Sequence, residues 1–412
     1  MIVAWRCAVC NTTVDLATPY PFTCPRSTPA DRHHVLHPLT VGPEPERLDD
    51  PNPFVAYGPR LGWWQFARTN GLTEQACIAL TRDLAAGFVV TPFERSDELS
   101  SAIGADVWVK DETGNVGGSH KGRHLVPILL HLRAAEALRK AERSRRPLAI
   151  ASCGNAAIAA ATLAARAEWP IDVFVPEWAS PNVLDVLTSL GASITPCPRR
   201  VDDAPGDPAV LRFRDAVVAG AIPFSVQGPE NGLCLDGGRT VGWELADADV
   251  ALDRVLVQVG GGALASCVGW GLGEGVRLDA VQTEGGAPFA RAWQRTAELG
   301  LGPDEVPGRW ADLMTPWDDP RSVADGILDD ETYDWLGVLD VVRRSGGRPV
   351  VVPETAVVRA RELGRATGIP VSATGTAGLA ALLTPEGASL PGERVAVIFS
   401  GVDRGSADGG DR

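Results

Sequence analysis

The chain has 412 residues, which at about 150 residues per domain predicts two lobes and a small appendage. Asp and Glu outnumber Lys and Arg by 52 to 38, giving a net charge of −14, and this balance argues against nucleic acid or an anionic membrane surface as a partner. The two long uncharged stretches, 147–165 and 255–273, are rich in alanine or glycine and are unsuited to spanning a membrane. With neither a signal peptide nor a disulfide framework, the sequence predicts a cytoplasmic protein.

In chain order, a segment rich in cysteine and histidine (1–40) precedes a proline-rich linker (40–59) and a helical stretch at 72–86. After Thr91-Pro92, short apolar runs alternate with helical patterns. Strands are expected at 107–109, 148–151, 171–175, 193–196, 255–259, 279–282, 349–352 and 394–399. Helices are expected at 121–140, 155–167 and 181–190. The alternation predicts an α/β fold whose largely parallel sheet is covered by helices.

Ligands of such sheets bind at the carboxyl ends of the strands. The chain contains only three lysines, Lys110, Lys121 and Lys140, and a glycine-rich turn after the strand at 107–109 delivers Lys121 to the first turn of a helix. There the helix dipole lowers the pKa of an amine and so favours its nucleophilic form. By itself the position also fits a surface lysine at a helix start.

Three further strand ends carry small or polar residues. Ser152-Cys-Gly-Asn-Ala-Ala opens an alanine-rich helix, and Gly260-Gly-Gly-Ala-Leu opens another, so both offer backbone N–H groups to an anion. Ser400 follows the last strand and suits a hydrogen bond to a ring nitrogen. Each feature taken singly also fits a plain helix cap or turn.

Taken together and in this order, these motifs resemble the fold-type II pyridoxal-phosphate enzymes, the superfamily of tryptophan synthase β, serine/threonine dehydratase and threonine synthase. The resemblance runs from about Thr91 to Val402 and also includes Lys110-Asp-Glu112 and Ile398-Phe-Ser-Gly401. It implies two lobes, pyridoxal 5′-phosphate as cofactor, a small amino-acid substrate and a homodimer.

The resemblance also implies a role for each matching residue. Lys121 becomes the Schiff-base lysine and the acid/base that moves the α-proton, Asn155 the contact to the 3′-oxygen of the cofactor, and Ser400 the partner of the pyridine nitrogen. The residues expected to bind the phosphate of the cofactor through their backbone are Gly260, Gly261, Gly262, Ala263 and Leu264. Those expected to bind the substrate are Ser152, Cys153, Gly154, Asn155, Ala156 and Thr374.

The Ser-x-Gly-Asn-Ala-Ala loop and the region 360–382 resemble threonine synthases, which favours γ-elimination from O-phosphohomoserine followed by β-addition of water. The triple-glycine sequence is more similar to the phosphate loop of the dehydratases. The presence of His120 directly before Lys121 resembles the sequence of tryptophan synthase β. The alternatives are therefore a serine/threonine dehydratase, a β-replacing enzyme of the cysteine synthase kind, or a non-catalytic relative that binds an amino acid or phosphate.

The N-terminal cysteines have zinc-ribbon spacing, with Cys7-x2-Cys10 followed by Cys24, but the position expected for a fourth cysteine holds Ser27. A structural zinc site needs four ligands. Either His33 or His34 completes a Cys3His site, or the ribbon is degenerate with free thiols. The expected organisation is a ribbon-like segment 1–40, a linker and helical region 41–90, a catalytic domain 91–402 with its small lobe at about 115–220, and a disordered tail 403–412.

Overall fold

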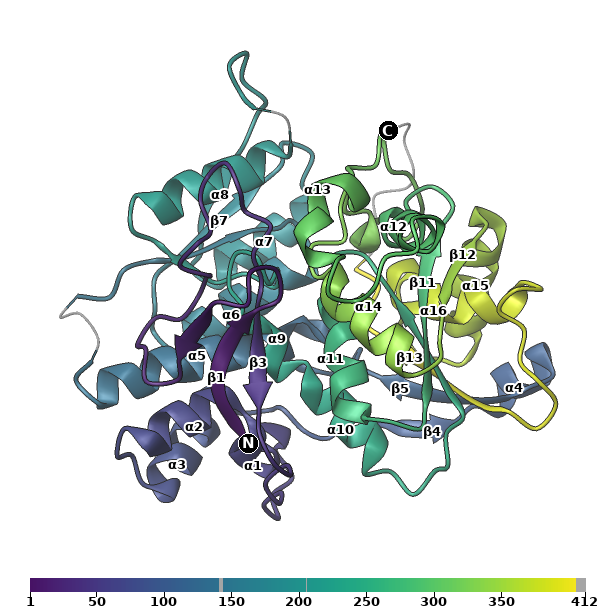
Figure 1. Cartoon of the computed structure of the whole chain (residues 1–412), viewed down its shortest axis with the longest axis horizontal. Helices are drawn as coiled ribbons and strands as arrows, with labels where there is room; N and C mark the ends of the chain where they lie inside the picture. Colours follow the sequence, from purple (N-terminus) through teal and green to yellow (C-terminus); the bar gives the residue numbers. More distant parts are fainter. Residues whose placement is uncertain (141–143, 205, 405–412) are drawn as a thin grey trace.

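The computed structural model describes residues 1–140, 144–204 and 206–404. Two larger sheets stand side by side, and in Figure 1 a small N-terminal sheet lies in front of the left-hand half of the molecule. The two larger sheets, flanked by helices and mainly parallel, confirm the predicted α/β class. No helix in the described part of the chain is long and apolar enough to cross a membrane.

The larger sheet has six strands in the order β12-β11-β10-β13-β5-β4, and only the edge pair β4–β5 is antiparallel. These strands are β4 (Phe93–Arg95), β5 (Asp106–Asp111), β10 (Arg254–Gln258), β11 (Arg277–Thr283), β12 (Pro349–Val352) and β13 (Arg394–Phe399). Every residue of β10 is buried, as expected for a central strand covered on both faces.

Alternate residues of β10 enter different hydrophobic clusters, because successive side chains of a strand point to opposite faces. Val255 and Val257 join the helices of one face, whereas Leu256 joins the helices of the other. The first group comprises α10 (Arg239–Ala246), α11 (Ala263–Leu272) and α14 (Trp335–Arg344). The second comprises α4 (Asp97–Ile103), α15 (Glu354–Ala366) and α16 (Ala373–Ala380).

The smaller sheet is parallel throughout, in the order β8-β7-β6-β9. It comprises β6 (Leu148–Ala151), β7 (Ile171–Val175), β8 (Ser193–Pro196) and β9 (Ile222–Pro223), with helices α6 (Asn155–Arg166), α7 (Pro181–Ser189) and α8 (Pro208–Val218) around it. The small alanine side chains of α6 let the turn at Gly117 approach this helix closely, since a Cβ on Gly117 would lie 3.0 Å from Ala159.

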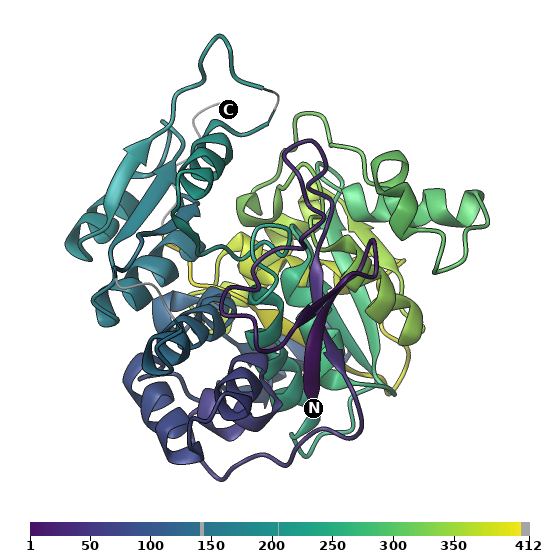
Figure 2. The ribbon, with the colours of Figure 1, turned by 60° about the vertical axis from the view of Figure 1, so that its left-hand side comes forward.

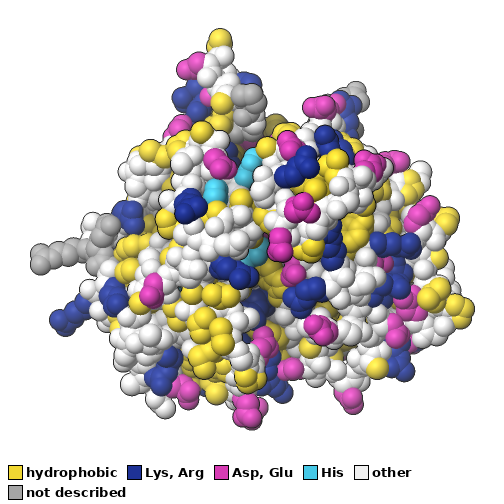
Figure 3. Space-filling model, in the orientation of Figure 1, with side chains coloured by type: hydrophobic (Ala, Val, Ile, Leu, Met, Phe, Trp, Pro, Cys, Tyr) yellow, Lys and Arg dark blue, Asp and Glu magenta, His cyan; other side chains and the backbone are white. Residues whose placement is uncertain are grey.

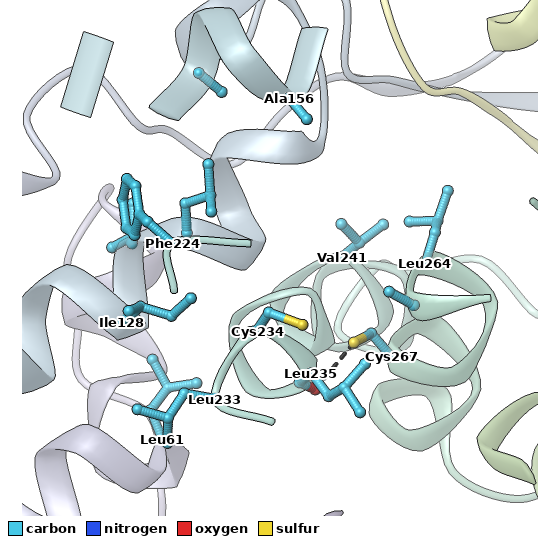
Figure 4. Packing of buried hydrophobic residues seen from close by; sticks show 14 of the residues in the cluster. Leu61, Ile128, Ala156, Phe224, Leu233, Cys234, Leu235, Val241, Leu264 and Cys267 are labelled. Carbon is cyan, nitrogen blue, oxygen red and sulfur yellow. Dashed lines mark hydrogen bonds between the residues drawn. The ribbon is translucent and has the colours of Figure 1, made fainter. Parts of the chain in front are cut away.

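Helices α5 (Lys121–Ala137) and α9 (Cys234–Gly237) join the two halves of the molecule. Figure 4 shows Ile128 and Phe224 on one side of this junction and Val241 and Leu264 on the other. A Cβ on Gly237 would collide with the backbone oxygen of Arg123. The glycine therefore lets α9 press against the first turns of α5 and fix where that helix begins.

The N-terminal segment folds as an antiparallel sheet in the order β2-β1-β3, which runs across the front in Figure 2. It comprises β1 (Ile2–Cys7), β2 (Thr13–Asp15) and β3 (Leu36–Thr40).

The proline-rich linker contains a short helix that its composition did not predict, α1 (Pro53–Ala56), capped by Asn52. The remaining helices are α2 (Gly62–Thr69), α3 (Glu74–Leu84), α12 (Pro288–Glu298) and α13 (Trp310–Leu313), with short 3-10 turns η1 (Gly58–Arg60), η2 (Val116–Gly118), η3 (Pro307–Arg309), η4 (Asp325–Ile327) and η5 (Ala381–Leu383).

Candidate active site

Lys121 is the first residue of α5, as the sequence predicts. The preceding turn contains Gly117 and Gly118, both at positive φ, a conformation that disfavours other residues. The turn is bonded to the residues that follow β13: the His120 N–H donates to the Ser400 carbonyl at 3.0 Å, and Ser119 forms a bridge with Gly401. The lysine and Ser400 are therefore held together by backbone hydrogen bonds.

Burial of Lys121 favours its neutral amine. Desolvation lowers the pKa of this lysine, and the largest opposing effect comes from the charge of Asp329. Within the described residues, no hydrogen bond or ion pair engages the Lys121 Nζ. A lysine that is partly desolvated and not held by a salt bridge suits nucleophilic and acid/base chemistry.

Asn155 begins α6, directly after the loop Ser152–Gly154 that follows β6. Its Oδ1 accepts a hydrogen bond from Arg404 Nε at 2.6 Å, and Arg404 also donates to the Gly117 carbonyl at 2.6 Å. The Asn155 amide nitrogen points at Gly401, where a Cβ would approach it to 2.9 Å. Because Arg404 occupies the amide oxygen of Asn155, the amide nitrogen is the end that can donate a hydrogen bond into the site.

The glycine loop follows β10 and begins α11, with Gly262 at φ +98°. A Cβ on Gly260 would lie 2.8 Å from both Asp329 Oδ2 and Ile327 Cα, so the position requires glycine. The Gly261 N–H stabilises the charged form of the nearby Asp329 carboxyl and so opposes the rise in its pKa. The loop therefore favours an anionic group, and its donor chemistry fits a phosphate.

Ser400 is buried at the end of β13, next to β10 in the sheet. Its Oγ accepts a hydrogen bond from Gln258 Nε2 at 2.7 Å, which leaves the hydroxyl hydrogen available to an acceptor in the site. Gln258 Nε2 also lies 3.2 Å from the Thr374 carbonyl. The Thr374 hydroxyl accepts from the Gly326 N–H at 2.9 Å, so Thr374 lies beside Ser400 but is engaged with η4.

Asp329 and Asp334 were not among the predicted site residues. Burial raises the pKa of Asp329 to about 6 and that of Asp334 to about 8. Asp334 Oδ2 accepts from the Gly228 N–H at 3.2 Å, whereas Oδ1 is buried without a partner among the described residues. The signal in the sequence was the run Asp329-Asp-Glu-Thr-Tyr-Asp334, but spacing alone cannot place it against Lys121.

A second cluster of buried charge lies beneath the site. Lys110 Nζ bonds Glu244 Oε2 at 2.5 Å, and Arg123 bridges Glu244 at 2.5 Å and Glu112 at 2.8 Å. Thr91 completes the cluster by donating to Glu112 and accepting from Arg123. Lys110 is thus fully engaged in a structural network and Lys140 is exposed after the end of α5, which leaves Lys121 as the candidate nucleophile.

Four N-terminal side chains lie together at the end of β1: Cys7, Cys10, Cys24 and His34. Their ligand atoms are all within 4.8 Å of one another. His34 Nδ1 faces Cys7 Sγ at 3.3 Å, while its Nε2 lies 3.3 Å from Asp31 Oδ2, an arrangement that orients a metal-binding imidazole. His33 instead stacks on Trp310 and lies 3.7 Å from Glu331.

The expected disordered tail (403–412) is described only at its beginning. Asp403 pairs with Arg361 at 3.0 Å and Arg404 binds Asn155. Residues 405–412 lie outside the described part of the chain.

Comparisons with known proteins point to one family. The family model described as "Pyridoxal-phosphate dependent enzyme" matches residues 84–401. The threonine synthase of Methanosarcina acetivorans is 27% identical over 311 residues, 71% of this chain and 69% of that protein. The serine dehydratase-like protein of Mus musculus is 30% identical over 210 residues, 50% of this chain and 60% of that protein. The crystal structure of a threonine deaminase from T.th. superimposes with a TM-score of 0.62 at 24% identity and covers 82% of this chain and 100% of that one.

Proposed function

Since the chain belongs to the fold-type II family of pyridoxal-phosphate dependent enzymes that eliminate or replace groups on amino acids, we propose that it acts as a threonine synthase. It would convert O-phosphohomoserine and water to threonine and phosphate. The observation that carries this proposal is that Lys121, Asn155, the glycine loop and Ser400 all follow the carboxyl ends of strands in the two larger sheets.

Bound pyridoxal phosphate supplies an electron sink that stabilises a carbanion formed next to the amino group. In our proposal, the N–H groups from Gly260 to Leu264 hold its phosphate, the Asn155 amide donates to the ring oxygen, and the Ser400 hydroxyl donates to the ring nitrogen. A hydroxyl at this position leaves the nitrogen unprotonated, which moderates the sink and favours elimination and replacement. Lys121, whose pKa is lowered by burial, holds the cofactor and moves the proton at Cα.

The proposed substrate contacts are the Ser152–Ala156 loop and Thr374. The loop opens α6 and offers backbone N–H groups to the substrate carboxylate. The threonine synthase relative, which aligns with most of this chain, supports O-phosphohomoserine as the substrate. We also propose a homodimer, on the basis of the family resemblance. A cytoplasmic location is proposed because the cysteines do not form the pattern of a disulfide framework.

One observation favours a serine/threonine dehydratase as the second candidate. Asp329 lies close enough to influence Lys121, and with a pKa of about 6 its carboxyl is mostly ionised at pH 7, so it would repel a phosphate on the substrate side chain. An uncharged hydroxyl as the leaving group avoids this repulsion. The serine dehydratase-like relative adds support, although the similarity covers only half of this chain.

The test is to incubate the holoenzyme separately with O-phosphohomoserine, L-threonine and L-serine, and to quantify threonine, phosphate, ammonia and 2-oxo acid. Equimolar threonine and phosphate, abolished by Lys121→Ala, would establish threonine synthase. Ammonia and 2-oxo acid from serine or threonine would establish the dehydratase. No product from any of them, with the cofactor bound, would refute both.

We further propose that zinc binds Cys7, Cys10, Cys24 and His34. Three thiols and one imidazole form a complete tetrahedral ligand set, and the contact between His34 and Asp31 supports it. Metal analysis of the purified chain should give one zinc per chain, reduced by His34→Ala and kept by the matched variant His33→Ala. Equal zinc in both variants, or none in the unmodified chain, would refute the assignment.

A further inference from the structure

A groove of about 760 Å³ lies between the N-terminal sheet and α14, on the face shown in Figure 3. Its size is that of a small-molecule site. None of the residues proposed above for the cofactor or substrate lines it. The groove is therefore separate from the candidate active site.

The lining carries an excess of positive charge, although the whole chain is strongly acidic. It contains five arginines and three carboxylates, in a protein of net charge −14. Glu44 is already shared by Arg60 and Arg239 at 3.3 and 2.9 Å, and Asp340 pairs with Arg344 at 3.3 Å. Two carboxylates are thereby neutralised within the lining.

Arg6 and Arg343 face the groove without a carboxylate partner among the described residues. Arg6 is exposed on β1, and Arg343 is half-buried over the ring of Trp293 with one hydrogen bond of 3.3 Å to Thr296. Arginine binds phosphate and carboxylate groups through two parallel N–H bonds. These two arginines form the free cationic part of the site.

Part of the remaining lining is apolar and aromatic, with Trp270, Leu336 and Leu339, whereas Asn11, Thr40 and Asp304 are polar. The ring of His37 packs edge-on against Trp270 at 4.9 Å. Burial and the charge of Arg6 lower the pKa of His37 to about 4, so this ring is neutral at pH 7. A flat apolar group can therefore lie here next to the arginines.

We propose that this groove binds a small organic phosphate, whose phosphate lies on Arg6 and Arg343 and whose flat part lies against Trp270 and the leucines of α14. A ligand here would contact the helix that begins directly after Asp334. The N–H of Asp334 in turn donates to the Gly261 carbonyl at 2.7 Å.

The experiment is calorimetric titration of the holoenzyme, freed of excess cofactor, with ATP, inorganic pyrophosphate and citrate. ATP should bind with a stoichiometry of one per chain and more tightly than pyrophosphate, which lacks a ring, and citrate, which lacks phosphate. Arg6→Gln and Arg343→Gln should each weaken ATP binding by about tenfold, as expected for loss of a charge-assisted hydrogen bond. The matched control is Arg359→Gln on α15, an exposed arginine paired with Glu362, which should leave binding unchanged.

Arg6 is exposed, so its variant should fold, and the thermal unfolding midpoint of each variant checks this. Absence of ATP binding up to millimolar concentration would overturn the proposal. Equal affinity for citrate and ATP would overturn the assignment to a phosphate, and ATP affinity unchanged in both groove variants would overturn the location.

Discussion

Lys110 and Lys121 lie eleven positions apart in the chain and in two buried clusters of very different character. Lys110 belongs to a cluster in which the carboxylates of Glu112 and Glu244 meet the charges of Lys110 and Arg123 at 2.5 to 2.8 Å. Lys121 faces Asp329 and Asp334, yet none of the described hydrogen bonds engages its amine, and Asp334 Oδ1 lacks a partner.

The charged groups of the Lys110 cluster stabilise the fold, whereas those of the Lys121 cluster are incompletely paired and so are available for chemistry. In the first, every charge has an opposite partner, which lowers the pKa of Glu112 to about 2 despite its burial. In the second, the desolvation of the carboxyls is not compensated, so their pKa values rise. Perturbed, incompletely paired groups of this kind are typical of active sites.

The largest expected effect is on catalysis. Lys121→Ala should lower kcat by about a thousandfold or more, in the range expected for loss of an acid/base group, and should change the unfolding midpoint little. Borohydride should attach the cofactor covalently to the unmodified chain and not to the variant. A variant that still forms the reduced adduct would show that another amine, such as Lys110, binds the cofactor.

The paired cluster should instead be sensitive in stability. Glu244→Gln leaves Lys110 and Arg123 with one carboxylate between them, and should lower the free energy of unfolding by about 3 to 5 kcal/mol. Urea unfolding measures this change. The surface variant Glu298→Gln should cost less than about 1 kcal/mol; equal losses would mean that the buried network contributes no more than a surface charge.

Asp334 should make stability depend on pH. Its pKa is raised from 3.8 to about 8 in the folded protein, so the folded chain binds an extra proton between these values. Stability is then greatest at the acidic end and falls as the pH rises toward 8, by up to about 1.4 kcal/mol per pH unit. Asp334→Asn should flatten this slope in unfolding midpoints measured from pH 5 to pH 8, and an unchanged slope would contradict the assignment.

The smallest expected effect concerns Asp329, whose charged form is stabilised by the Gly261 N–H that we assign to the cofactor phosphate. Asp329→Asn removes a competing negative charge and should strengthen pyridoxal phosphate binding by about three- to tenfold, equivalent to roughly 1 kcal/mol. Absorbance titration of the apoenzyme measures this affinity, with Asp312→Asn as the surface control. Weaker binding in the Asp329 variant would instead make this carboxyl part of the cofactor site.

Each strand expected from the sequence is present, because hydrophobic runs are local signals, whereas β1 to β4 and β9 were not predicted. Lys121, Asn155 and the glycine loop all lie at strand ends or helix starts for this reason. Asp329, Asp334 and Arg404 were missed because their importance depends on contacts with residues far away in the chain. The ribbon lies between these cases: spacing selected three cysteines, but only the fold distinguishes His34 from its neighbour His33.

The order of strands in the larger sheet has a consequence for biosynthesis. β13 follows both β5 and β10 in the chain, yet it lies between them in the centre of the sheet. Until it is made, β10 and β5 each present an unpaired edge, and such edges favour aggregation. A nascent chain that stalls between β12 and β13 would lack both the centre of its sheet and Ser400, so the site that we propose can form only after β13 has been made.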